Sequence, residues 1–182
     1  MGHRPSEIPL DQALLMTATD QRDAILCDTV LPGTASGKIE LFSEPLEQRF
    51  GYGVPRYQAV PRSRPFTIIS PSSSKRTNAT FGGSAASDGP EVVEINPADA
   101  DAAGIVDGDR VELSNDKGSV VLRAMVTDAV APGVLYSPKG SWLRSSETGQ
   151  TVNALIDADM KTDIVDGACY HETFVDMSVR GS

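Results

Sequence analysis

The stretch Val93–Leu113 reads VEINPADADAAGIVDGDRVEL and decides the fold more than any other part of the chain. Pro97 suits the first helical position, Asn96 is a fair cap before it, and Gly104 can end the helix in the left-handed conformation. The stretch therefore predicts a strand, one short helix, an Asp-Gly-Asp turn and a second strand. Two strands joined by so small a helix favour a compact barrel with crossover connections.

Signals for short strands continue on both sides of this stretch. A buried apolar run begins after Pro65, and a hairpin is predicted around the turn 115–118. Together these short strands, with little helix and no long amphipathic segment, predict a mainly β fold built as a barrel. The expected strands are 66–69, 91–95, 110–114, 118–127, 134–136 and 174–179.

The first part of the chain has a different character. Residues 1–64 are punctuated by prolines, which exclude long helices and central strands. Only a helix-like patch over 9–18 and an extended patch over 37–42 are expected there. We therefore divide the chain into an irregular N-terminal extension over 1–64, which packs against something else, and a barrel domain over 65–182.

Composition excludes several classes of protein. The chain has 182 residues, 40% of them hydrophobic, and a net charge of -9, so its long-range field repels nucleic acid and anionic membranes. We expect no membrane insertion, because no apolar run is long enough to span a bilayer. Cys27 and Cys169 form neither a metal motif nor a disulfide framework, and the first residues do not resemble a signal peptide. A cytoplasmic location is expected, although a periplasmic parent enzyme is not excluded.

One loop departs from the acidic character of the barrel domain. Residues 70–81 contain four serines, Lys75 and Arg76 but no acidic residue. Hydroxyls, backbone N–H groups and cations can all donate to an anionic group. The loop is therefore either a pocket for an anion or an ordinary solvated connection, and composition alone leaves both open.

Several short sequence motifs of this chain occur together, and in the same order, in the members of one known family. They are 36–43, 78–81, 96–109, 153–155 and 162–170. Residues from about 37 to 180 thereby resemble the C-terminal dinucleotide-binding domain of the molybdopterin oxidoreductases, which include formate dehydrogenases, nitrate reductases and dimethyl sulfoxide reductase. The resemblance implies a six-stranded double-psi β-barrel with short helices that binds molybdopterin guanine dinucleotide.

The resemblance also implies which residues contact the cofactor. Lys75, Arg76 and Lys139 are expected to meet phosphate, Trp142 to stack on a ring, and Asn153 to read a pterin edge; Trp142 as a core or lid residue and Asn153 as a helix cap remain alternatives. Asp163 is expected to face guanine, or to serve as a cap or turn. The family's usual histidine in the first loop is absent, and Ser74 and Lys75 stand there instead. The expected cofactor-binding residues are Ser70, Ser72, Ser73, Ser74, Lys75, Arg76, Asn78, Thr80, Lys139, Trp142, Asn153, Asp163, Tyr170 and His171.

The chain lacks the parts that carry redox chemistry in this family. Two isolated cysteines cannot hold an iron–sulfur cluster, and Cys169 matches a small packing position rather than a metal ligand. We therefore expect no catalytic and no metal-binding residues, and no activity of the chain alone. The expected partners are the remaining domains or the catalytic subunit of a molybdenum or tungsten oxidoreductase, which hold the metal.

Two other functions are compatible with such a barrel. The chain could be a stand-alone protein-interaction or adaptor module, which would not need the polar loops. An aspartic protease or a self-cleaving decarboxylase is disfavoured, because neither the Asp-Thr/Ser-Gly pattern nor a suitable Gly-Ser site is present. A shared fold does not by itself carry function.

Overall fold

The structure is a computed structural model that describes residues 4–11, 25–28, 30–87, 91–146, 148–162 and 164–180. The chain divides into two compact units, Met1–Tyr57 and Gln58–Ser182. Among the described residues, no helix has both the length and the apolar character needed to cross a membrane.

The first unit has little regular structure. Besides η1 (Pro5–Glu7) it contains α1 (Glu44–Phe50), which has a proline in its first turn and ends at Gly51 in the left-handed conformation with φ 71°. None of the α1 residues is buried. Most of the helix-like patch expected at 9–18 lies outside the described residues. Residues 37–42 form no strand, because none of the described segments pairs with them.

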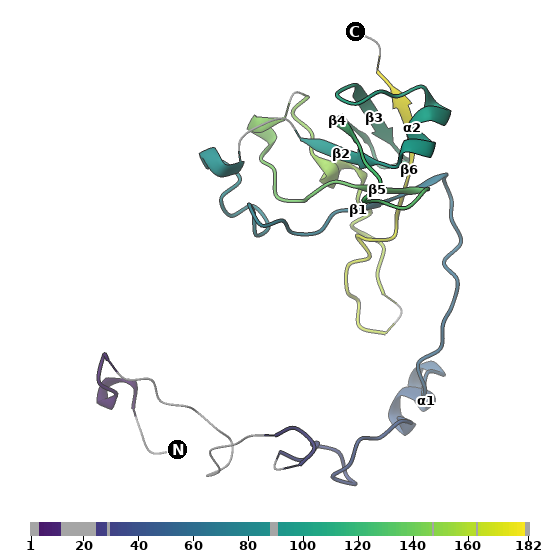
Figure 1. Cartoon of the computed structure of the whole chain (residues 1–182). Helices are drawn as coiled ribbons and strands as arrows, with labels where there is room; N and C mark the ends of the chain where they lie inside the picture. The colour runs from purple at the N-terminus through teal and green to yellow at the C-terminus, as the bar shows by residue number, and fades with distance from the viewer. Residues whose placement is uncertain are drawn as a thin grey trace. The chain divides into compact units, whose positions relative to one another are not determined.

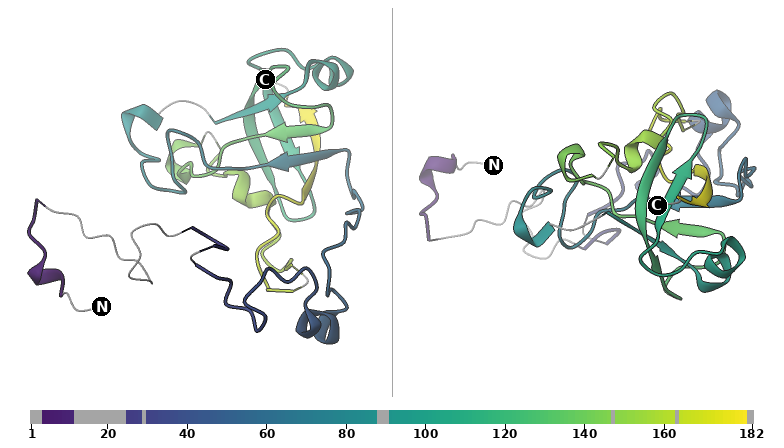
Figure 2. Two further views of the ribbon diagram at one scale, coloured as in Figure 1. Left: turned by 60° about the horizontal axis from the view of Figure 1, so that its bottom comes forward. Right: turned by 90° about the horizontal axis from the view of Figure 1, so that it is seen from above.

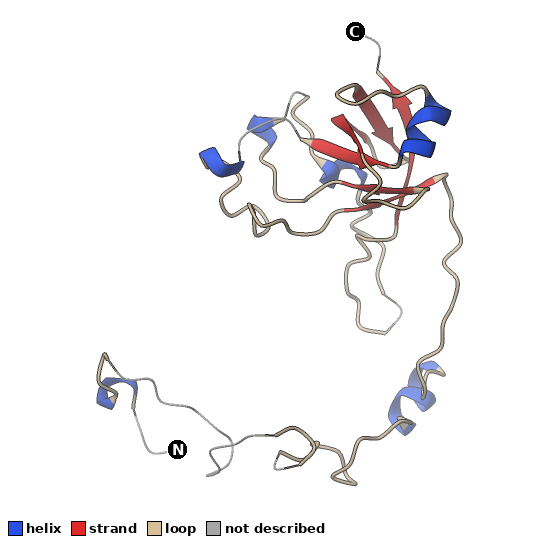
Figure 3. Ribbon diagram, in the orientation of Figure 1, coloured by secondary structure: helices blue, strands red, loops and turns tan. Residues whose placement is uncertain are grey.

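The second unit is built on six strands that close into a barrel in the order β1-β5-β2-β4-β3-β6 (Figures 1 and 3). Each lies where the sequence predicted a strand, with ends shifted by a residue at most. The strands are β1 (Phe66–Ile69), β2 (Val92–Ile95), β3 (Arg110–Ser114), β4 (Ser119–Val126), β5 (Val134–Tyr136) and β6 (Thr173–Val179). Short helical turns lie in the connections at η2 (Ala85–Ser87), η3 (Leu143–Ser145) and η4 (Val152–Leu155).

The pairing of the strands has an internal two-fold relation. β1 pairs with β5 and β2 with β4 in parallel, whereas the other neighbours are antiparallel. Exchanging β1 with β4, β2 with β5 and β3 with β6 reproduces both the strand order and the sense of every pairing. The fold is a six-stranded double-psi β-barrel, as expected.

The barrel interior is filled by alternate residues of the strands. Since successive side chains of a strand point to opposite faces, every second residue enters the core. Val93 and Ile95 of β2, and Val111 and Leu113 of β3, are completely or almost completely buried. Ile68, Leu122, Leu135 and Val175 join them in one core cluster.

The helix expected in the deciding stretch is α2 (Pro97–Ala103), and its predicted caps are confirmed. The Asn96 side chain accepts a hydrogen bond from the Ala98 N–H at 3.0 Å and donates to the Val130 carbonyl at 2.8 Å. Gly104 closes the helix with φ 67°. One asparagine thus caps α2 and also holds it to the connection that leads into β5.

We expect Asn96→Ala to lower the free energy of unfolding by about 1–2 kcal/mol, because both the cap and the bond to Val130 are lost. Asn96→Asp keeps the acceptor but loses the donor, and its loss should be smaller. Urea denaturation of the 182-residue chain measures both. Asn153→Ala, at an exposed position, is the control, and equal losses for Asn96→Ala and the control would contradict the assignment.

Candidate functional site

The topology gathers the long connections of the barrel at one end. β1 and β5 run in parallel and β6 runs against β1, so the C-terminal ends of β1 and β5 lie beside the start of β6. This end, here called the loop end, carries residues 70–91, 115–118 and 137–172. The opposite end carries α2 and the connection 127–133, and both views of Figure 2 show α2 across the barrel from the long loops.

Every described residue expected to contact a cofactor belongs to the loop end. Eight come from the connection after β1 and the others from the connection between β5 and β6. Asp163 lies outside the described residues. The order and direction of the strands therefore bring the described residues that are expected to contact a cofactor to one end of the barrel.

The two connections stay paired beyond the strands. The Ser137 N–H donates to the Ile69 carbonyl and the Lys139 N–H to the Pro71 carbonyl, both at 3.0 Å. Ser70 and Ser137 are buried beside this extension. The parallel ladder thus continues past β1 and β5 and fixes how their loops leave the barrel.

Further along, the two loops meet at what we call the loop junction, formed by Arg76, Asn78, Glu91, Gly140, Ser141 and Trp142. Arg76 donates to the Ser141 hydroxyl, and Trp142 Nε1 donates to the Ala79 carbonyl at 2.8 Å. Gly140 has φ +98°, and a Cβ there would collide with the Asn78 carbonyl. Only glycine allows so close an approach.

Trp142 joins the loops through its ring as well. Gly82 and Gly83 lie so close to the indole that a Cβ on either would be within 3 Å of it. The Arg144 guanidinium stands over the ring at 4.0 Å from the centroid, a cation–π arrangement. One face of the indole is thus taken by Arg144, and stacking of Trp142 on a cofactor ring remains a prediction.

Glu91, just before β2, lies at the junction with its charge enclosed. Burial raises the pKa of Glu91 above its ordinary value of 4.5, and the nearby Ser141 hydroxyl and Arg76 charge lower it only in part. Both carboxylate oxygens of Glu91 and Nε of Arg76 are buried without a hydrogen-bond partner among the described residues. The junction therefore encloses the Glu91 carboxylate oxygens and Nε of Arg76, although both residues are partly exposed.

A second cluster joins the loop after β5 to the segment before β6. Lys139 Nζ stands 5.0 Å from the centroid of the Tyr170 ring, and the rings of Tyr170 and His171 are 4.1 Å apart. The buried Thr173 donates its hydroxyl to the Tyr170 carbonyl at 3.0 Å. Three of the expected residues are therefore in direct contact.

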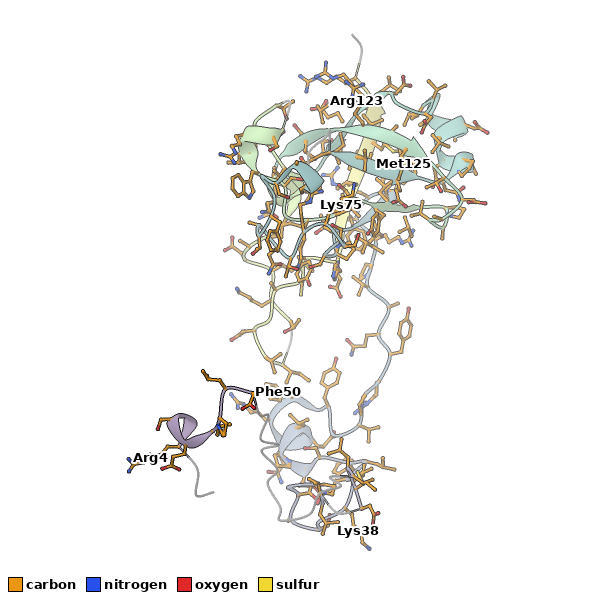
Figure 4. The ribbon with its side chains drawn as sticks, turned by 60° about the vertical axis from the view of Figure 1, so that its left-hand side comes forward. Arg4, Lys38, Phe50, Lys75, Arg123 and Met125 are labelled. Carbon is orange, nitrogen blue, oxygen red and sulfur yellow. The ribbon has the colours of Figure 1, made fainter. Side chains whose placement is uncertain are left out.

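Other expected residues lie on the loop surface. Ser72, Ser74, Lys75 and Thr80 are exposed, and the turn they belong to is held by a bridge between Ser73 and Arg76. Figure 4 shows Lys75 on the barrel unit. Asn153 is exposed within η4. The helix-capping alternative for Asn153 is wrong, because Thr151 is the residue that precedes η4.

Next to these loops the barrel unit has a cavity of about 330 Å³. Arg64, Asp116 and Lys117 are among its lining residues; Arg64 pairs with Asp116 at 2.6 Å, and Lys117 pairs with Asp157 at 3.1 Å. The free thiol of Cys169 also lines it. None of the described residues expected to contact a cofactor lines it. Arg64 and Lys117 are thus paired within the protein, and we assign the cavity no ligand.

Sequence reasoning missed Glu91, Ser141 and Gly140 as parts of the site. Gly140 and Ser141 lie between Lys139 and Trp142, which the resemblance implied as cofactor contacts, and a glycine between polar residues there is a signal of close backbone approach. Glu91 carried no such signal, because an acidic residue at the start of a strand is commonly a solvated one. Only the fold shows that its carboxylate is enclosed.

The fold and the loop end define a double-psi β-barrel that presents polar loops on one side, and comparison with known proteins gives the family. Residues 66–174 match the model of the Molydopterin dinucleotide binding domain. Because this match spans more than half of the chain, the chain belongs to that family. Resemblance to the molybdopterin oxidoreductases is thus confirmed.

Curated relatives agree. A dimethyl sulfoxide/trimethylamine N-oxide reductase of Cereibacter sphaeroides is 33% identical over 136 residues, covering 64% of this chain and 16% of the relative. The probable oxidoreductase YoaE of Bacillus subtilis is 34% identical over 142 residues, covering 75% of this chain and 21% of the relative. The chain therefore spans about a fifth, or less, of the length of these relatives.

A solved structure supports the fold. Acetylene hydratase from Pelobacter acetylenicus superposes with a TM-score of 0.64 at 17% identity, covering 81% of this chain and 24% of that one. At this identity the likeness concerns the fold alone.

Gly140→Ala tests the close approach of the two loops. We expect a loss of about 2–4 kcal/mol in the free energy of unfolding, since the left-handed backbone and the collision with Asn78 both cost energy. Gly149→Ala is the matched control, because Gly149 also has positive φ (+70°) but open space around it. Chemical denaturation compares them, and similar losses for both variants would show that the loops are not in contact.

The raised pKa of Glu91 predicts a pH dependence. Between the ordinary value of 4.5 and the higher folded value, the folded chain binds more protons than the unfolded chain, so stability falls as pH rises through this window. Glu91→Gln lacks this loss. Its stability relative to the natural chain should therefore increase from pH 4 to pH 7, measured by thermal unfolding, and a pH-independent difference would contradict the burial of the carboxylate.

Proposed function

We propose that the loop end of this barrel holds molybdopterin guanine dinucleotide and orients it. The observation that carries the proposal is that all described residues expected to contact the cofactor come from two connections that hydrogen-bond to each other at one end of the barrel. Chemically different donors are thereby available to one ligand, as a dinucleotide with charged and planar parts requires.

The chemistry of the loop end fits such a ligand. The Ser70 hydroxyl is buried without a hydrogen-bond partner among the described residues, and a buried unpaired hydroxyl is costly unless something completes it. Lys75 is exposed and lies in a stretch, residues 70–81, that contains no acidic residue, which suits it to a diphosphate. Lys139, Tyr170 and His171 form a polar and aromatic wall that suits a ring system.

Each residue keeps a distinct role in this proposal. Lys75 and Lys139 bind phosphate oxygens, and the exposed hydroxyls of Ser72, Ser74 and Thr80 donate around them. Asn153 reads a pterin edge, and Asp163 accepts from guanine. When bound, the pterin supplies the ligands for molybdenum or tungsten and carries the electron chemistry, whereas this chain binds, orients and excludes water.

The first unit supports a role within a larger protein. Leu26, Ile39, Leu41 and Tyr57 expose between 66% and 92% of their surface, and exposed apolar groups in such number mark a contact surface. Because the relatives are several times longer than this chain, we propose that the remaining domains or the catalytic subunit of an oxidoreductase cover this surface. A cytoplasmic location is proposed with it.

Titration of the 182-residue chain with GDP tests the binding and the guanine form together. GDP should bind and CDP should not, if guanine is read. Lys75→Ala combined with Lys139→Ala should weaken GDP binding about five- to tenfold, because two charge-assisted contacts are lost.

Lys38→Ala, an exposed lysine of the first unit labelled in Figure 4, is the control and should leave affinity unchanged. Equal binding of GDP and CDP would exclude the guanine form. A chain that binds neither nucleotide at millimolar concentration would favour the alternative, a protein-interaction module.

A further inference from the structure

Lys139 differs from other cations of the loop end in the group that holds its charge. Lys117, for example, pairs with the Asp157 carboxylate at 3.1 Å. Among the described residues no carboxylate forms an ion pair with the Lys139 ammonium. Nζ of Lys139 instead stands 5.0 Å from the centroid of the Tyr170 ring. The ammonium is therefore held by an aromatic face and not by an opposite charge.

This kind of contact leaves the lysine able to bind an anion. An aromatic ring attracts a cation through its quadrupole, and the ring carries no net charge that would cancel that of the cation. A lysine side chain has many rotamers, and fixing it at the moment of binding costs entropy. A lysine that a ring already holds pays less of this cost, so its charge is both available and preorganised.

The backbones that carry the ammonium and the ring are fixed relative to the same strand. The Lys139 N–H donates to the carbonyl of Pro71, just after β1, at 3.0 Å. The buried Thr173, which pairs with Ile68 of β1, donates its hydroxyl to the Tyr170 carbonyl at 3.0 Å. The contact between the lysine and the tyrosine thus joins two segments that β1 already places side by side.

We propose that Tyr170 is a positioning residue: its ring holds the Lys139 ammonium in place for a phosphate group of the ligand. The inference rests on the proposed function, because it explains how one of the expected phosphate contacts is placed. It also gives the two lysines different tasks. Lys139 offers its charge at a fixed place, whereas the exposed Lys75 adjusts to the ligand.

The contact can be measured without any ligand. Protons that lie over an aromatic face resonate at higher field, so the ε-methylene protons of Lys139 should appear upfield of those of the exposed Lys38. The shift should disappear in Tyr170→Leu, which removes the ring, and return in Tyr170→Phe, which keeps it. NMR of the 182-residue chain with labelled lysine measures the shift, and Lys139→Arg assigns the signal.

Binding of GDP tests whether the ring acts through the lysine. Tyr170→Leu and Lys139→Met should each weaken GDP binding about threefold. The double variant should also lose about threefold and not about ninefold, because a ring without its ammonium has nothing left to position. Tyr170→Phe should recover most of the affinity that Tyr170→Leu loses. Tyr52→Leu, in a half-buried tyrosine of the first unit, is the control and should change neither the affinity nor the Lys139 signal.

Two results would overturn the inference. One is the absence of the upfield shift in the natural chain. The other is a loss of about ninefold in the double variant, because additive losses indicate that Tyr170 acts independently of Lys139.

Failure of this inference differs from failure of the proposed function. If the natural chain binds no GDP, the proposed function fails, while the shift still decides whether Tyr170 holds Lys139. If GDP binds and Tyr170→Leu loses the shift without losing affinity, the proposed function stands and Tyr170 has no positioning role.

Discussion

Parallel pairing of β1 with β5 is the constraint on which the rest of the structure depends. Two strands that run in the same direction must release their following loops at the same end of the barrel, although the loops lie far apart in sequence. Here the pairing continues through the bonds of Ser137 and Lys139 to the loop after β1. The connections 70–91 and 137–172 are thereby brought side by side. The ligand contacts proposed for this chain all depend on this proximity.

Local sequence was sufficient for the barrel elements and insufficient for the site. Asn96, Pro97 and Gly104 each act within one turn of the chain, so their residue types could be interpreted without tertiary information. Alternating burial in β2 and β3 was equally local. In the first unit α1 was not anticipated, because Leu46 and Phe50, although at helical spacing, are too few to establish a periodic pattern, and only Pro45 and Gly51 mark its ends.

The site depended on contacts across the sequence. Family resemblance indicated which loops matter, but it could not distinguish Lys75, which is exposed, from Arg76, which donates to Ser141. These adjacent cations look equivalent in a sequence. Their difference arises from Ser141, which a distant loop contributes, and no pattern within the first loop contains that information. For Trp142 the sequence left stacking on a ligand and a core or lid role both open; its ring contacts Arg144 and the glycines at 82 and 83, and stacking stays a prediction.

The two-fold relation between the halves of the barrel has a consequence for how such a domain can diversify. The exchange of β1–β3 with β4–β6 also exchanges the two ends, so the connection 70–91 corresponds to the short connection 127–133, and 137–172 corresponds to 96–109. One end therefore retains the minimal form of each crossover while the other is elaborated. The compact connections are therefore enough to close the barrel at one end, and the length added at the other end can vary without changing the strand order.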